Sequence, residues 1–164
     1  MKRIVKVILL VLLTLLIIIQ FVKPAKNKGV EIAANQITAK HKVPENVQQI
    51  LKTSCYDCHS NTTKYPWYSR VQPIAWFLHD HIIEGKKELN FSTFSSSPTA
   101  RRYKKFKEIG EQVKTGEMPL QSYTLIHRDA ILTPEEKLEI ETWAANSMKE
   151  MEGSYPPDSL KRKK

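Results

Sequence analysis

The stretch Cys55-Tyr56-Asp57-Cys58-His59 constrains this chain more than any other feature. It holds both cysteines of the protein, two residues apart, with a histidine directly after the second. C-x-x-C-H is the attachment signature of a c-type haem. The spacing suits this chemistry, because one turn of backbone presents two thiols to the two vinyl groups of the macrocycle. The motif therefore predicts one covalent haem c on Cys55 and Cys58, with His59 as the proximal iron ligand.

Other uses of a C-x-x-C pair fit the sequence less well. A structural zinc site needs further cysteine or histidine ligands in a set pattern, and His79, His81 and His127 do not provide it. A disulfide that closes a two-residue loop removes little chain entropy. A thioredoxin-like pair follows a strand, whereas the residues before Cys55 have a helical pattern. A redox-active dithiol remains the main alternative to covalent haem.

The N-terminus carries a long apolar run from Ile4 to Val22, interrupted only by Lys6, Thr14 and Gln20. About 20 apolar residues suffice to span a bilayer as a helix. A cleaved signal peptide is the alternative, but the following Lys-Pro-Ala-Lys offers no clear small-residue cleavage site. We therefore expect residues 1–22 to form a transmembrane helix that anchors the chain in the membrane.

Flanking charge does not orient this segment, because lysines lie on both sides of it. The haem motif does, since covalent haem attachment in bacteria takes place on the outer face of the plasma membrane. We therefore expect the chain to cross the plasma (inner) membrane once, with its soluble domain facing the periplasm.

Composition divides the rest of the chain into three parts. Residues 23–42 are polar and predict a flexible tether, residues 43–152 a haem-binding domain, and residues 153–164 a basic C-terminal tail. Helices are expected from Pro44 to Ser54, from Pro73 to Gly85, from Pro98 to Gly116, and from a capping box at Thr133. No segment alternates with period two, so the predicted fold class is all-α.

Three of these helices have apolar residues at helical spacing, which predicts the faces that they bury. The predicted buried positions are Ile74, Phe77, Leu78, His81 and Ile82 in the second helix, Tyr103, Phe106, Ile109 and Val113 in the third, and Ile140, Trp143, Ala144, Ser147 and Met148 in the last. Arg101, Arg102, Lys104, Lys105 and Lys107 are expected on the outer side of the third helix.

A second axial ligand for the iron is sought among Met118, His79, His81 and His127. Met118 lies in the loop Gly116-Glu117-Met118-Pro119 after the third helix, rather than on a helix face. Methionine paired with histidine is the ligation of electron-transfer cytochromes c. Met118 is therefore the expected distal ligand, with His81 as the alternative because it shares the apolar face of its helix.

Four aromatic residues are candidates for packing against the haem: Tyr65, Trp67, Tyr68 and Trp76. They are equally well explained as ordinary core residues. In a small cytochrome the two roles overlap, because about 100 residues bury limited apolar area and the macrocycle supplies more.

From about Val43 to Glu150 the chain resembles the bacterial haem-binding domain family of small cytochrome c-like proteins. The resemblance rests on Cys55 to Asn61, Tyr65-Pro66-Trp67-Tyr68, Pro73-Ile74-Ala75-Trp76, Glu84-Gly85 with Leu89-Asn90-Phe91-Ser92, Gly116-Glu117-Met118-Pro119 and Leu132 to Trp143. It implies a cytochrome c-like helical domain around a covalent haem, attached through Cys55 and Cys58 with His59 on the iron. It implies no particular physiological reaction.

Two functions follow as hypotheses. The first is a membrane-anchored monohaem cytochrome that transfers single electrons to or from a redox partner protein, with an acidic partner suggested by the basic third helix. The second is a haem peroxidase-like enzyme or haem-based sensor with an open or labile distal site, where His81 or His127 would act. A nucleic-acid partner is disfavoured despite the net charge of +9, because no nucleic-acid-binding motif is present.

Overall fold

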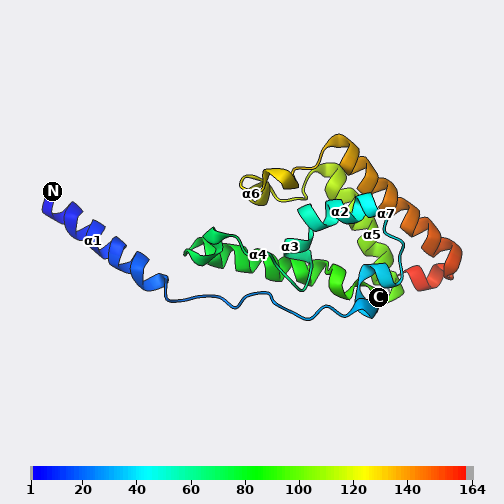
Figure 1. Ribbon diagram of the computed structural model, residues 1–164, viewed down its shortest axis with the longest axis horizontal. Coiled ribbons are helices and arrows are strands. Elements are labelled where there is room, and N and C mark those ends of the chain that lie inside the picture. The colour runs from blue at the N-terminus through cyan, green and yellow to red at the C-terminus, as the bar shows by residue number, and fades with distance from the viewer. Residues whose placement is uncertain (1, 162–164) are drawn as a thin grey trace.

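The computed structural model describes residues 2–161 and has seven α-helices in that range (Figure 1). They are α1 Lys2–Ile19, α2 Glu45–Ser54, α3 Tyr56–His59, α4 Ile74–Glu88, α5 Thr99–Thr115, α6 Gln121–Thr124 and α7 Pro134–Ser154. Short 3₁₀ helices connect them: η1 Ala33–Asn35, η2 Ile37–Ala39, η3 Trp67–Arg70, η4 Phe91–Ser96, η5 Arg128–Ala130 and η6 Pro157–Leu160. Residues 2–161 contain no β-strand, which confirms the all-α prediction.

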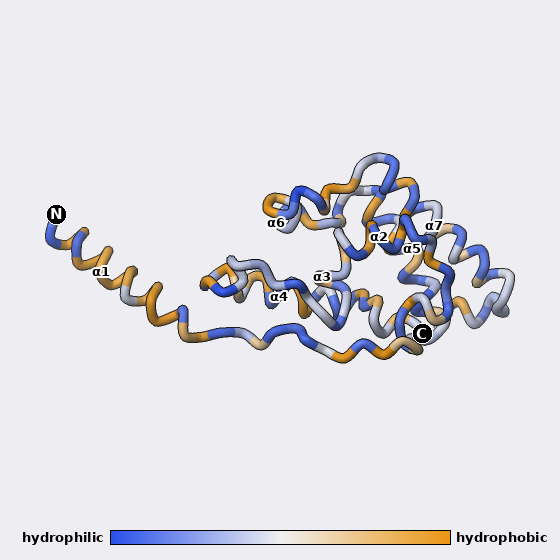
Figure 2. Tube along the Cα trace, viewed as in Figure 1, coloured by the Kyte–Doolittle hydropathy of each residue, from blue (hydrophilic) through white to orange (hydrophobic). Residues whose placement is uncertain are grey.

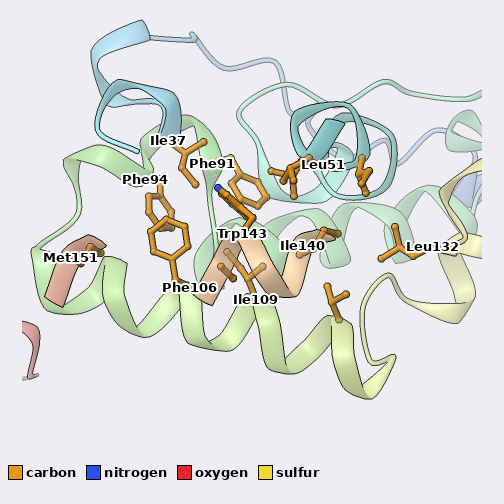
Figure 3. Close-up of a cluster of buried hydrophobic side chains, with 14 residues drawn as sticks. Ile37, Leu51, Phe91, Phe94, Phe106, Ile109, Leu132, Ile140, Trp143 and Met151 are labelled. Carbon is orange, nitrogen blue, oxygen red and sulfur yellow. The ribbon is translucent and has the colours of Figure 1, made fainter. Parts of the chain in front are cut away.

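The core of the domain lies around α5 and α7, which pack side by side in opposite directions (Figure 1). Phe106 and Ile109 of α5 belong to the same buried cluster as Trp143 of α7. The rings of Phe106 and Trp143 meet edge to face, with their centroids 5.4 Å apart (Figure 3). Leu51 of α2 and Phe91 of η4 close the same cluster. The predicted apolar faces of α5 and α7 are thus confirmed, although Tyr103 and Met148 are only partly buried.

Local sequence signals set the start of α7 and the end of α5. Thr133 accepts a hydrogen bond from the Glu136 amide, and the Glu136 carboxylate accepts one from the Thr133 amide, so the expected capping box is formed. Gly116 ends α5 with a φ of 75°, a left-handed conformation that glycine adopts at low cost. The turn places Met118 directly after α5.

Two predictions for α4 are wrong. The helix does not end at Gly85 but continues to Glu88. Its buried side chains are Ala75 and Ile82, whereas Ile74 and Phe77 are 42% and 52% exposed. Periodicity alone placed these two residues in the core, because it cannot tell an apolar surface patch from a buried face.

Residues 23–42 were expected to form a flexible tether, but the structure packs them along the domain. The side chain of Asn27 donates to the carbonyl of Ser60 at 2.9 Å, and the Gly29 amide donates to the carbonyl of Asn61 at 2.7 Å. Ile37 is 1% exposed within the core, and the buried His41 accepts a hydrogen bond from Arg102 at 2.9 Å. The domain therefore begins well before residue 43.

α1 projects from the domain with an apolar surface and no buried residue (Figures 1 and 2). Within residues 2–161 no helix is both long enough and apolar enough to cross a membrane. The expected transmembrane span is therefore not supported.

Most of the described C-terminal segment is helical. α7 extends to Ser154, and Leu160 of η6 packs against the core. Only the end of the predicted basic tail, residues 162–164, lies outside the described residues.

Candidate haem-binding site

The five-residue motif forms the junction between α2 and α3. Cys55 ends α2, with its amide bonded to the carbonyl of Leu51 at 2.9 Å. Its own carbonyl accepts from the amides of Cys58 and His59 at 3.2 and 3.0 Å. One closed turn thus holds both thiols and the imidazole, as the spacing predicts.

His59 is oriented by the end of α4. Its Nδ1 lies 2.9 Å from the carbonyl oxygens of both Gly85 and Leu89. A carbonyl only accepts hydrogen bonds, so Nδ1 carries the proton and Nε2 keeps its lone pair. Burial lowers the pKa of His59, which favours the neutral ring. A neutral imidazole with Nδ1–H bonded to carbonyls and Nε2 free has the form that binds a metal.

Gly85 allows α4 to approach this turn. A Cβ at position 85 would lie 3.0 Å from the carbonyl oxygen of Cys58 and 3.4 Å from Cε1 of His59. The missing side chain lets the Gly85 carbonyl reach His59. Gly85 thus acts inside the helix, as a point of close contact, rather than as the helix end that the sequence suggested.

Two cavities open beside this turn. The larger, of about 490 Å³, has Cys55, His59 and Met118 in its wall, with apolar side chains from the core behind them. These apolar residues are Leu51, Leu89, Phe91, Ile109, Val113, Leu132 and Ile140. The smaller, of about 190 Å³, is lined by Cys55, Cys58, His59 and Met118 among others. Both cavities thus share a thiol, the imidazole and a thioether.

The two cysteines are free thiols, and neither is activated. Burial and the neighbouring Cys58 raise the pKa of Cys55 to about 12. Burial and Asp57 raise the pKa of Cys58 to about 11. Redox-active dithiols instead have a lowered thiol pKa, because the thiolate is the nucleophile. The surroundings therefore do not favour the dithiol alternative.

Comparison with known protein families gives one match, to the family described as "Haem-binding domain", over residues 14–146. The chain belongs to the haem-binding domain family. No curated protein and no solved structure matches it. The residues fit the group that the family binds: a partly apolar cavity, an imidazole with a free Nε2, and two thiols on one turn.

The structure separates the candidates for the distal position in this haem-binding domain. Met118 lies in the wall of both cavities, with His59. His81 lines only the smaller cavity, and its Nδ1 is bonded to the carbonyl of Phe77 on its own helix at 2.8 Å. His79 and His127 line neither cavity. Met118 stays the predicted distal ligand, because the loop after α5 brings it into the wall of both cavities.

The four aromatic candidates are not brought to the haem cavities. Trp67 is 80% exposed, and the hydroxyl of Tyr65 accepts from the Asn27 amide instead. Tyr68 is buried against His127, with its hydroxyl 2.5 Å from Nε2, and Trp76 donates to the carbonyl of Val22 at 3.0 Å. None of the four lines either cavity beside His59. The aromatic ring in the larger cavity is Phe91, from the Leu-Asn-Phe-Ser block.

An ionic group at the larger cavity was missed by the sequence reasoning. Lys105 was expected on the outer side of α5, but its side chain is only 11% exposed and lines the cavity. Its ammonium lies 2.6 Å from Glu108 and 3.2 Å from Glu88. Arg102 of the same predicted outer face is also buried. With Lys105 paired in this way, α5 offers an acidic partner less free positive charge than the sequence suggested.

A second missed group ties the loop after Met118 to the motif. Tyr123 of α6 donates to the carboxylate of Asp57 at 3.0 Å, between the two cysteines. Its ring stacks on His127 at a centroid distance of 4.3 Å, and His127 meets Tyr68. Asp57 also accepts from the amide of Lys64 at 3.1 Å. The acidic residue in the C-x-x-C spacer was the only sequence signal for this contact.

Proposed function

We propose that this haem-binding domain is a monohaem c-type cytochrome that transfers single electrons. The observation that carries the proposal is the state of His59. Two carbonyls fix its Nδ1, and its ring lies in the wall of a cavity that Cys55 and Met118 share. When bound, the haem supplies the one-electron chemistry; the chain supplies attachment, orientation and shielding from water.

The roles of the chain follow from its contacts. Cys55 and Cys58 hold the haem through thioether bonds, since both are free thiols on one turn. His59 provides Nε2 to the iron, and the carbonyls of Gly85 and Leu89 keep its ring in place. Hydrogen bonding at Nδ1 also makes the imidazole a stronger donor, which is one means of tuning the potential.

Met118 is the proposed distal ligand. It shares both cavities with His59, and the Tyr123–Asp57 contact holds its loop against the motif. Met118 and His59 would together hold the iron, and a methionine paired with a histidine raises the reduction potential of the haem in cytochromes c. This arrangement supports an electron carrier rather than an enzyme.

One observation favours the alternative, a peroxidase-like enzyme or sensor with a labile distal site. His81 lies in the wall of the smaller cavity, together with Met118 and His59. If Met118 did not bind the iron, His81 would be the nearest candidate for a distal acid or base.

Attachment to a membrane is part of the proposal. From Ile4 to Ile18 every large apolar side chain of α1 is about half exposed or more. An apolar surface of this extent indicates burial in lipid or protein. We propose that α1 inserts in the plasma membrane and that the domain lies on its outer, periplasmic side, where c-type haem is attached.

The absorption spectrum of haem-loaded protein tests the proposed function. Wild type should show a low-spin, six-coordinate spectrum at neutral pH in both oxidation states. Met118→Ala should convert it to high spin, whereas His81→Ala, the matched control, should leave it unchanged. A wild-type high-spin spectrum would support the alternative and refute the electron-carrier assignment. A spectral change in His81→Ala but not in Met118→Ala would refute Met118 as the distal ligand and assign His81 in its place.

A further inference from the structure

A set of exposed apolar side chains surrounds the point where α1 joins the domain. Its members come from η3, the start of α4 and the segment after α6, and all are at least 42% exposed. We call this set the apolar patch: Trp67, Val71, Ile74, Phe77, Leu125 and Ile126. Trp67 and Leu125 are the most exposed, at 80% and 67%. None of the six lines either cavity at the haem site.

The segments that carry the patch lie together although they are distant in sequence. Tyr68, the neighbour of Trp67, bonds to His127, the neighbour of Ile126, with 2.5 Å between the hydroxyl and Nε2. η3 packs against α4, which carries Ile74 and Phe77. Figure 2 shows apolar colour at both the start of α4 and the α6 end of the domain, on the side from which α1 departs.

α1 is fastened inside this patch. The Gln72 amide donates to the side chain of Gln20 at 2.9 Å, and Gln20 donates back to the carbonyl of Gln72 at 3.2 Å. The Gln72 side chain, 2% exposed, donates to the carbonyl of Val22 at 2.7 Å. Because Gln20 follows α1 directly and Gln72 lies between Val71 and Ile74, the helix and the patch are held next to each other.

This connection decides what covers the patch. Whatever environment buries the apolar surface of α1 also lies against the residues at its base. Tryptophan is enriched where hydrocarbon meets water, and exposed cations at Lys23, Arg70 and Arg128 border the patch, in a position to meet anionic headgroups. We propose that the apolar patch lies in the headgroup region of the membrane that holds α1, so that the domain rests on the bilayer in one orientation.

This inference rests on the proposed membrane attachment, and its test separates the two. The haem-loaded, full-length chain is reconstituted in vesicles of phosphatidylcholine and phosphatidylglycerol with radiolabelled acyl chains. The photo-reactive residue p-benzoyl-phenylalanine replaces Trp67, Leu125 or, as the matched control, Leu138. Leu138 is 64% exposed on α7 and lies outside the patch. Flotation of each variant with the vesicles is measured before illumination.

We expect all variants to float and the chains labelled at 67 and 125 to acquire at least fivefold more lipid label than the chain labelled at 138. Flotation with only background labelling at 67 and 125 overturns the inference while leaving the attachment by α1 intact. Crosslinks from 67 and 125 to a second copy of the chain, without lipid label, overturn it as well. Failure to float refutes the attachment itself, and the inference with it.

Discussion

At the scale of single residues, Gly85 matters most for the geometry of the site. Gly85→Ala places a Cβ 3.0 Å from a backbone oxygen that cannot move without the motif turn. We expect a loss of about 1–3 kcal/mol in the free energy of unfolding, measured by chemical denaturation. The matched control is Gly110→Ala in α5, where a Cβ would lie 3.8 Å from that of Ala144. Since helical glycine costs roughly 0.5–1 kcal/mol relative to alanine, Gly110→Ala should be neutral or stabilising. Equal effects of the two substitutions would contradict this role of Gly85.

His41 gives the domain a pH dependence at the same scale. Burial, with Arg102 and Lys40 nearby, lowers its pKa to about 4. Between pH 6.5 and 4 the unfolded chain therefore binds a proton that the folded chain does not, so folding is most favourable above this range. Lowering the pH from 7 to 5 should cost about 2 kcal/mol of stability through this group.

The measurement is chemical denaturation at several pH values between 7 and 5, on wild type and His41→Gln. Glutamine can accept the Arg102 hydrogen bond but does not titrate in this range. The stability of His41→Gln should therefore vary less with pH than that of wild type. If the stability of both proteins fell equally with pH, a group other than His41 would be responsible for the pH dependence.

At the scale of elements, the contact between α6 and the motif turn holds the Met118 loop against the motif. Tyr123→Phe keeps the ring stacked on His127 but removes the donor to Asp57. The loss should be about 1–2 kcal/mol, because the partly buried carboxylate loses a partner. This loss of stability is measured as a shift of the denaturation midpoint. Tyr103→Phe is the control: its hydroxyl donates to Glu152 at an exposed site, so its cost should be below about 0.5 kcal/mol. A larger loss of stability in Tyr103→Phe than in Tyr123→Phe would show that α6 does not hold the Met118 loop.

The elements also show where sequence reasoning succeeds. α5 and α7 were predicted well, because apolar periodicity, Gly116 and the capping box at Thr133 are local signals. The attachment motif was recognisable as well, since Cys55, Cys58 and His59 belong to five consecutive residues; their roles at the haem stay predictions. The polar segment 23–42 was misjudged, because a single apolar residue, Ile37, and hydrogen bonds to distant partners fix it. Lys105 was misplaced for the same reason: only the fold brings Glu88 beside it.

At the scale of the whole molecule, a small helical domain has a cavity against its hydrophobic core. Leu51, Phe91 and Ile140 belong both to the core cluster and to the wall of the 490 Å³ cavity. A domain of this size buries limited apolar area, and a haem held in the cavity would extend the core. We therefore expect the haem to contribute to the packing of the domain as well as to its chemistry.

Covalent haem on Cys55 and Cys58 is tested most directly by the intact mass of the full-length chain after denaturation. The protein is produced together with a bacterial haem-attachment system, as wild type, as the double variant Cys55→Ser and Cys58→Ser, and as His81→Ala. We expect wild type and His81→Ala to retain the mass of one haem in denaturant and the double variant to retain none. A wild-type chain without bound haem mass, or a double variant that keeps it, would contradict the account.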